Sequence, residues 1–276
     1  MPSTRFLFWN INRKPLAEAV ADLAEEQRAD VVVLAESRLD PAAILRALNT
    51  GRRGGFHFPP ETSKRVTIFT RFSRRFLRPA PENDRSSHMA IRRLALPARP
   101  EILVVAVHLP SKLRKSHHES QTSECFEWAR RIIAEEERAG HRRTVVLGDF
   151  NLNPFEPGLV AANCFNSVMS RQIASGRSRT VLGQKFPFFY NPMWGHLGDL
   201  RGHTAGSYFY NSSEHVNYYW NVFDQVLIRP ELVGGFDSSQ LRIVASVGQR
   251  HLVRANGRPN GTDFSDHLPI VFELVF

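Results

Sequence analysis

The stretch TVVLGDFNLNP, residues 144–154, decides how this sequence folds. It begins with Thr144 to Leu147, a mostly β-branched run that predicts an interior strand covered on both faces. It then breaks into a glycine, an acid and two asparagines before it ends at a proline. Such a break is typical of an Asx-rich turn. It is also what a ligand site needs, because open α/β sheets bind ligands beyond the carboxyl ends of their strands.

Apolar runs of the same kind recur along the rest of the chain. They predict strands at 4–9, 31–35, 66–70, 88–96, 102–107, 223–228, 241–245 and 270–275. Apolar residues at helical spacing predict helices at 15–28, 40–49 and 120–139. In the last helix Phe126 is expected to face inward, and the run EEER at 135–138 to face water. Strands and helices mixed in this way predict an α/β fold with sheets covered by helices.

The organisation of the chain favours one domain over residues 1–276. With 276 residues and 42% hydrophobic content, the chain is long enough to bury a sizeable core. It contains no internal repeat and no long linker rich in Pro, Gly and Ser. Residues 163–221 are the least regular part and are expected to supply long loops, which at that length are more often functional than idle.

The net charge indicates what kind of partner the protein binds, and the cysteine count indicates the cellular compartment in which it folds. The formal net charge is +9 and the pI is near 10.1, which favours an anionic partner such as nucleic acid or an acidic membrane surface. Cys125 and Cys164 are too few for a disulfide framework. The N-terminal residues do not read as a secretory signal, and no apolar run approaches membrane-spanning length. We therefore expect a cytoplasmic protein with no membrane attachment.

Polar side chains follow several of the predicted strands at the point where each strand ends. These are Asn10 and Asn12, Glu36, His108, Asp149 and Asn151, and, around the last two long strands, Asp224, Asp266 and His267. Each can be read singly as a turn former, a helix cap or a structural histidine. Their recurrence in six segments indicates one shared site instead.

The chemistry of these residues fits metal-assisted hydrolysis. A hard divalent cation such as Mg²⁺ prefers carboxylate and amide oxygens, which Glu36 and Asn10 can provide, with Asp149 or Asp266 nearby. The absence of paired cysteines and closely spaced histidines argues against structural zinc. We therefore predict Mg²⁺ as the cofactor, with Mn²⁺ as a possible substitute.

Proton transfer requires a second set of groups. A histidine oriented by a carboxylate can take a proton from an attacking water, and this role suits His267 with Asp224 behind it. His108 and Asn151 can then stabilise or protonate the phosphate oxygens as negative charge develops.

The complete pattern resembles the endonuclease/exonuclease/phosphatase superfamily, the fold of deoxyribonuclease I and exonuclease III. The matching segments are WNIN at 9–12, LAES at 34–37, VHLPSK at 107–112, GDFNLNP at 148–154, FDQVLI at 223–228 and SDHLPI at 265–270. The resemblance implies a two-sheet α/β sandwich with helices outside and an active site at one edge. It also implies metal-assisted hydrolysis of a phosphate ester.

Carried over by motif, the resemblance makes Glu36 the main metal ligand, with Asn10 beside it and Asp266 as a further candidate ligand. Asn12 stands where some members have an acid, and we count it with the candidate substrate contacts.

For catalysis, the resemblance implies that Asp149 and Asn151 contact the nucleophile and the phosphate. Asp266 pairs with the base His267, and Asp224 orients that histidine. His108 matches the histidine of the deoxyribonuclease-like and phosphatase-like branches.

Nucleic acid is the expected substrate, with DNA ranked ahead of RNA. Beyond the net charge, Lys112, Arg114 and Lys115 follow His108 where a phosphate chain would pass, and Asn153 is a further candidate contact. The segments FPFFYNPMW at 186–194 and SYFYNSSEHVNYYW at 207–220 offer aromatic rings that can stack on bases or form a small hydrophobic cluster. Two alternatives stay open: a Mg²⁺-dependent phosphatase or phosphodiesterase acting on a small or lipid phosphate, and a nucleic-acid-binding module without catalysis.

Overall fold

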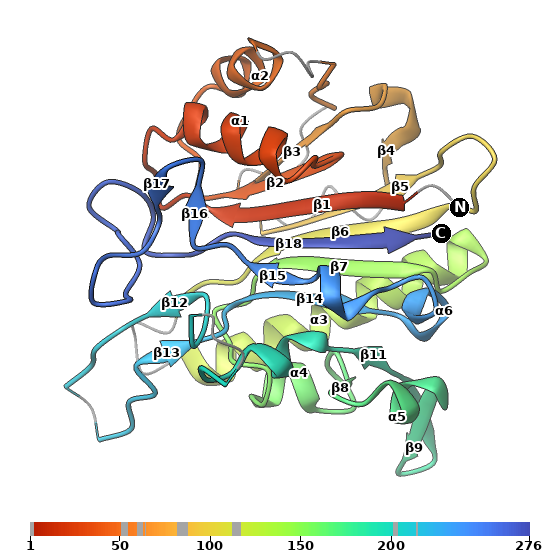
Figure 1. Ribbon diagram of the computed structural model, residues 1–276. Helices are drawn as coiled ribbons and strands as arrows, with labels where there is room; N and C mark the ends of the chain where they lie inside the picture. The colour runs from red at the N-terminus through yellow and green to blue at the C-terminus, as the bar shows by residue number, and fades with distance from the viewer. Residues whose placement is uncertain are drawn as a thin grey trace.

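Two large mixed sheets form the centre of the computed structural model, which describes residues 3–50, 55–59, 63, 65–81, 88–111, 117–200, 204–213 and 215–276 (Figure 1). In spatial order, the five-stranded sheet runs β15 (Arg242–Ile243), β18 (Ile270–Val275), β1 (Ser3–Asn10), β2 (Val31–Ala35) and β3 (Val66–Thr70). The seven-stranded sheet runs β4 (Leu77–Pro79), β5 (Met89–Leu94), β6 (Ile102–His108), β7 (Thr144–Asp149), β14 (Asp224–Ile228), β11 (Phe189–Tyr190) and β8 (Ser167–Val168).

The other strands form short two-stranded ribbons. These are β9 (Ser178–Val181) with β10 (Gln184–Pro187), β12 (Tyr208–Phe209) with β13 (Trp220–Asn221), and β16 (Ser246–Val247) with β17 (Arg250–His251). The helices are α1 (Ala17–Glu26), α2 (Pro41–Thr50), α3 (His117–Ala139), α4 (Pro157–Val160), α5 (Arg171–Ser175) and α6 (Pro230–Val233), with 3-10 turns η1 (Arg74–Phe76), η3 (Pro192–His196) and η4 (Ser238–Gln240). Among the described residues, no helix is both long enough and apolar enough to cross a bilayer.

Alternating side chains along β6 explain why the sheets stack with helices outside. Val104 and Ala106 belong to the core shared with the five-stranded sheet, while Val105 and Val107 pack in a second cluster with residues of α3. A strand covered on both faces needs apolar residues at every position, which is what the continuous apolar runs of the sequence provide. The predicted two-sheet α/β sandwich is confirmed. That residues 1–276 make one catalytic domain stays a prediction.

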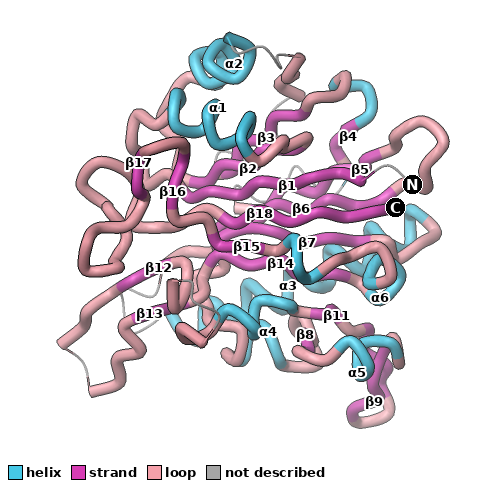
Figure 2. The backbone as a smooth tube through the Cα atoms, in the orientation of Figure 1, coloured by secondary structure: helices cyan, strands magenta, loops and turns pink. Residues whose placement is uncertain are grey.

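Strand direction brings the chemically active ends together. β1 runs parallel to β2, and β6 runs parallel to β7, so these four strands finish at the same end of their sheets. β18 and β14 run antiparallel to β1 and β7, so they begin where those strands finish. In Figure 1 this end lies at the left, beside β12, β16 and β17, where Figure 2 shows mostly loop.

The predicted strands and helices are found at their expected places, with shifted ends. The strand predicted at 88–96 is β5, Met89–Leu94, and the strand predicted at 241–245 is reduced to β15, Arg242–Ile243. The predicted long-loop region, 163–221, contains several short elements joined by loops.

The prediction for the outer face of α3 is wrong. Phe126 is 40% exposed, whereas Glu135 and Glu136 of the EEER run are buried. The buried face of α3 carries Trp128 and Ile132, and one further turn along the same face reaches Glu135 and Glu136. Burial of these carboxylates is possible because each meets an arginine from a distant strand or loop, since a buried charge needs a partner.

Arg229 is the partner of Glu136. Its guanidinium lies 2.8 Å and 3.1 Å from the two carboxylate oxygens, donates to two backbone carbonyls, and stacks 3.7 Å from the centre of the Phe189 ring. Both side chains are almost completely buried. This pair ties α3 to the end of β14 across the seven-stranded sheet.

We expect Arg229→Met to lower the free energy of unfolding by about 3–5 kcal/mol, because it strands the Glu136 carboxylate in the core. Chemical denaturation measures the effect. Arg142→Met is the matched control: Arg142 approaches the same carboxylate at 3.9 Å but is 41% exposed, and its removal should cost less than about 1 kcal/mol. Equal stability of Arg229→Met and the wild type would contradict this account of α3.

Candidate active site

The strand ends bring the predicted residues together. Asn10 ends β1, Glu36 follows β2, and His108 ends β6. Asp149 ends β7 and lies in register with His108 on one side and with Asp224, the first residue of β14, on the other. The register therefore places the side chains of His108, Asp149 and Asp224 side by side at one edge of the seven-stranded sheet.

Gly148 allows β7 to end at this edge. Its backbone has φ +152°, and a Cβ atom there would lie 2.0 Å from the carbonyl oxygen of Val107. No other residue fits between the two parallel strands without displacing one of them. The glycine of the GDFN segment therefore sets the position of the Asp149 carboxylate.

Asp149 is the hub of the cluster. Its Oδ2 accepts a hydrogen bond from Asn10 Nδ2 at 2.8 Å and lies 3.8 Å from His108 Nε2 and 3.9 Å from His267 Nε2. Its Oδ1 accepts from the backbone N–H of Asn151 at 2.8 Å. One fully buried carboxylate thus joins both sheets and both histidines.

Glu36 forms a second acidic centre in contact with the first. Its backbone is in the left-handed region, with φ +50°, a conformation that a non-glycine residue adopts rarely and often at functional sites. Oε1 lies 3.3 Å from His108 Nε2, and Oε2 lies 3.0 Å from Arg13 Nε. The hydrogen bond from His108 and the nearby charge of Arg13 lower the pKa of Glu36 to about 2. The side chain is therefore an ionised carboxylate at neutral pH.

His267 is held from both of its ends. Nδ1 lies 2.9 Å from Asp224 Oδ2, and the backbone carbonyl of His267 accepts a hydrogen bond from Trp9 Nε1 at 2.9 Å. Ser265 Oγ accepts from the backbone N–H of His267, and Ser207 Oγ accepts from the backbone N–H of Asp224. With Nδ1 engaged by Asp224, Nε2 is the nitrogen left facing Asp149.

The surroundings of His267 favour a bound proton. Burial by itself would lower the pKa of the imidazole, but the charges of Asp224 and Asp149 and the hydrogen bond to Asp224 outweigh it and raise the pKa to about 10. In this arrangement the ring therefore carries a proton at neutral pH, and positive charge bound beside Asp149 would lower its pKa toward the neutral form that a base requires.

Asp266 and Asn12 lie at the rim of the cluster. Asn12 Nδ2 donates to Asp266 Oδ1 at 2.8 Å, and the backbone N–H of Asn12 donates to Asn10 Oδ1 at 3.0 Å. Asp266 thus reaches the cluster through Asn12, whereas the carboxylate on the His267 ring is that of Asp224.

The predicted substrate contacts divide into three groups. Asn151 Nδ2 donates to the carbonyl of Leu109, so this amide lies within the cluster next to the β6 end. Asn153 is 2% exposed and binds the Asn221 side chain and the backbone of Val222, which holds β13 rather than facing the cluster. Lys112, Arg114 and Lys115 lie outside the described residues.

Two residues of the site were missed from the sequence. Arg13, on Glu36, follows the asparagines of the first strand and carries no spacing signal; its φ of +60° is visible only in the fold. The ring centre of Tyr208 lies 4.5 Å from that of His267. Burial and the nearby Asp266 and Asp149 carboxylates raise the pKa of Tyr208 well above its usual range, so it is a neutral phenol. Tyr208 belongs to the aromatic segment at 207–220, within which no pattern singles it out.

The donor atoms of the cluster suit a hard divalent cation. Asp149, Asp224 and His267 each offer a ligand atom within 4.8 Å of the others, and the Glu36 carboxylate is ionised. Oxygen donors of this kind, without cysteine, fit Mg²⁺ or Mn²⁺ better than structural zinc. The Glu36 side chain is 19% exposed, whereas Asp149 and Asp224 are fully buried, so Glu36 is the more accessible acid for a cation.

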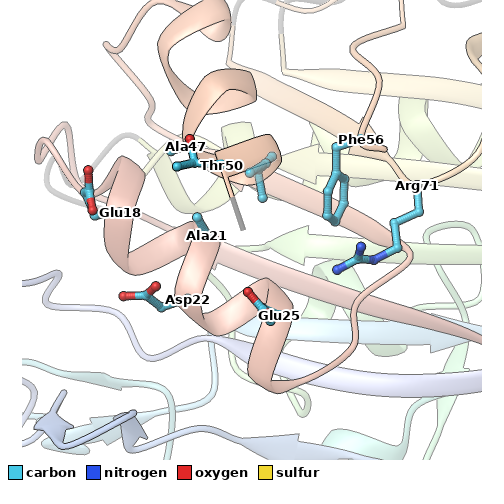
Figure 3. Close-up of a pocket in the computed structure, with 9 residues that line it drawn as sticks. Glu18, Ala21, Asp22, Glu25, Ala47, Thr50, Phe56 and Arg71 are labelled. Atoms are coloured by element: carbon cyan, nitrogen blue, oxygen red, sulfur yellow. The ribbon is translucent and has the colours of Figure 1, made fainter. Parts of the chain in front are cut away.

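A separate pocket of about 200 Å³ lies between α1 and α2, as Figure 3 shows. Its lining includes Glu18, Asp22 and Glu25 opposite Arg71. An excess of carboxylates disfavours a phosphate ester there. The pocket shares no lining residue with the strand-end cluster, so the cluster is a distinct site.

Comparisons with known proteins agree with this fold. A sequence model described as the Endonuclease/Exonuclease/phosphatase family matches residues 7–267. No curated protein matches the chain.

Three solved structures share the fold at low identity. D. rerio TDP2 complexed with single strand DNA product is 16% identical, with 100% of each chain covered and a TM-score of 0.54. The 3′ phosphatase NExo from Neisseria, bound to a product DNA hairpin, is 18% identical over 99% of this chain and 100% of its own, with a TM-score of 0.54. An AP endonuclease from Archaeoglobus fulgidus is 15% identical over 99% of both chains, with a TM-score of 0.53.

Proposed function

This chain belongs to the Endonuclease/Exonuclease/phosphatase family, and from that premise we propose that it is a divalent-metal-dependent phosphodiesterase that hydrolyses nucleic acid by attack of an activated water. DNA ranks ahead of RNA as substrate.

One observation supports the proposal most strongly. A single carboxylate oxygen, Asp149 Oδ2, lies within 3.9 Å of Asn10, His108 and His267, and His267 is backed by the buried Asp224. Phosphate ester hydrolysis needs a proton acceptor, a way to neutralise phosphate oxygens, and groups that orient the water. The three requirements are met by side chains that the chain brings together from widely separated segments.

His267 is the proposed general base. Asp224 fixes Nδ1 of the imidazole, which directs Nε2 toward the Asp149 carboxylate. Once the ring is neutral, a water held near Asp149 can pass a proton to Nε2 as it attacks phosphorus. Asp224 stabilises the imidazolium that results, because its charge lies on the ring.

Glu36 and Asn10 are the residues proposed to hold the cation, with Asp266 reaching the same region through Asn12. A bound divalent cation supplies charge that stabilises a phosphate oxygen and the leaving group. The fit rests on the low pKa of Glu36 and on the oxygen donors around it.

Arg13, His108 and Asn151 are proposed to act on the phosphate oxygens. Arg13 is 49% exposed at the rim of Glu36, where a guanidinium can reach an incoming phosphate. His108 lies between Glu36 and Asp149 and can donate from Nε2. Asn12 is proposed as a substrate contact at the same rim.

The choice of nucleic acid rests on charge and on the relatives. A net charge of +9 favours a polyanion, and two of the three structures described above were solved with DNA. Lys112, Arg114 and Lys115 stay proposed contacts. A cytoplasmic location is proposed from the two free, buried cysteines, Cys125 and Cys164, which suit a reducing compartment.

A substrate panel tests the proposal. Purified protein with Mg²⁺ is given single- and double-stranded DNA, RNA, abasic DNA, a phosphoinositide and a phosphomonoester, beside an Asp149→Asn/His267→Ala control. We expect cleavage of at least one nucleic acid by the wild type only. Binding should weaken as salt rises, since each neutralised phosphate releases counterions with a log–log slope of roughly −0.7 to −0.9.

Other outcomes of the panel would reassign the protein. Release of inorganic phosphate from the lipid or the monoester, with nucleic acids intact, favours a phosphatase, as the Neisseria protein NExo is. Salt-sensitive binding without hydrolysis of any compound favours a binding module.

A further inference from the structure

A row of aromatic rings leads from the candidate base to the protein surface. The Tyr208 ring lies 4.5 Å from the His267 ring, and the Tyr210 ring lies 6.5 Å from Tyr208 at an interplanar angle of only 12°. Tyr208 is partly buried, while Tyr210 is 47% exposed. The outer end of the row is thus an accessible aromatic ring aligned with rings that end at the catalytic centre.

The hairpin of β12 and β13 is fixed to the active site by its backbone. Tyr208 forms an isolated antiparallel bridge with His267, and the N–H of Leu268 donates to the carbonyl of Ser207 at 2.7 Å. Because side chains alternate along a strand, Phe209 points to the face opposite Tyr208 and Tyr210. There it packs against Trp220 and under the guanidinium of Arg258, 4.2 Å from the ring centre. The two tyrosines are therefore presented by a hairpin anchored on its other face.

A second exposed tyrosine, Tyr218, packs against the loop that follows β7. Tyr218 is 57% exposed, and its ring lies 5.4 Å from that of Phe155, which also contacts Trp194. Phe155 comes four residues after Asn151 of the cluster. Aromatic side chains from two segments therefore border the site.

The chemistry of these aromatic rings indicates which ligand would bind them. The exposed Tyr210 ring, parallel to Tyr208, offers a flat π face, which a nucleobase covers well whatever its identity. A base in the interior of a duplex already has both faces stacked, so only an unpaired base or a frayed end can use the row. The phosphate attached to such a base would lie toward the His267 end of the row, beside the cluster.

We infer that the Tyr208–Tyr210 face of the β12–β13 hairpin is a stacking platform for an unpaired nucleobase next to the phosphate that is cut. This inference rests on the proposed nuclease function and adds to it a preference for single-stranded or frayed substrate. The Tyr208 ring packs against His267 and so fixes the position of the platform, and the base stacks on the Tyr210 ring.

Fluorescence of 2-aminopurine in a single-stranded DNA oligonucleotide tests stacking without hydrolysis. The oligonucleotide is titrated in chelator with wild type, Tyr210→Ala, Tyr210→Phe and Tyr219→Ala. Tyr219 is the matched control, since it is 51% exposed on the same hairpin but its ring lies beside Phe209. We expect quenching by the wild type and by Tyr210→Phe, and a dissociation constant about 5- to 150-fold weaker for Tyr210→Ala.

An oligonucleotide with an abasic site in place of 2-aminopurine should bind wild type and Tyr210→Ala equally. The platform is overturned if Tyr210→Ala binds and quenches like the wild type, or if Tyr219→Ala loses as much affinity. Cleavage of the same oligonucleotide in Mg²⁺ separates the two proposals. Cleavage with no effect of Tyr210→Ala on binding refutes the platform alone, and Tyr210-dependent quenching without cleavage supports the platform while refuting the nuclease.

Discussion

Replacement of His267 by alanine is expected to lower kcat on the true substrate by about two to four orders of magnitude, the range for loss of a positioned proton acceptor. Nε2 of this ring is the nitrogen that faces Asp149, and Asp224 fixes the ring by its other nitrogen. Without the imidazole, the attacking water has no group of comparable basicity to receive its proton. Initial rates at saturating substrate measure the loss.

Two further variants separate proton transfer from folding. His267→Gln can still donate an N–H to Asp224 but cannot accept a proton near neutral pH, so its kcat should fall as far as that of His267→Ala. Asp224→Asn should lower kcat as well, because it removes the charge that stabilises the imidazolium. His57→Ala is the control, since His57 is an exposed histidine bridged to Thr70 only by its backbone. Near wild-type turnover of His267→Gln would move the role of base to another residue, with His108 the first candidate.

Removal of the divalent cation is expected to abolish activity, and Mg²⁺ or Mn²⁺ should restore it. Glu36→Gln should raise the Mg²⁺ concentration for half-maximal activity by at least about 10- to 100-fold, the cost of losing even an outer-shell partner of a metal site. The substitution keeps the shape of the side chain and removes its charge. Titration of Mg²⁺ into chelator-treated protein measures the shift.

Glu18→Gln is the matched control for the metal prediction. Glu18 lines the acidic pocket between α1 and α2, away from the strand ends, so its loss should leave the Mg²⁺ requirement unchanged. Full turnover in chelator, or equal Mg²⁺ curves for Glu36→Gln and the wild type, would contradict the assignment of Glu36.

The strand-end residues could be predicted because local patterns mark where each strand ends. Continuous apolar runs mark strands covered on both faces, and the first polar residue after each run lies at a sheet edge. The parallel pairing of β6 with β7 then places His108 beside Asp149. The order of apolar and polar residues located these side chains, and the family resemblance supplied the roles predicted for them.

Contacts between distant segments could not be predicted in this way. Glu136 is buried because Arg229, 93 residues away in the sequence, pairs with it in the core. The spacing of apolar residues along the helix does not predict such a pairing. Arg13 reaches Glu36 through a left-handed backbone turn, and Tyr208 of β12 reaches His267 through an isolated bridge to the segment before β18. Asp266 is tied to Asn12, whereas the motif alone suggested a pairing with His267.

Cleavage of an end-labelled single-stranded DNA oligonucleotide tests the central claim most directly. Wild type and the Asp149→Asn/His267→Ala variant are compared in Mg²⁺ and in chelator, with products resolved by length. We predict shortened products only for the wild type in Mg²⁺. Equal cleavage in chelator, or equal cleavage by the double variant in Mg²⁺, would contradict a metal-dependent site built from these strand ends.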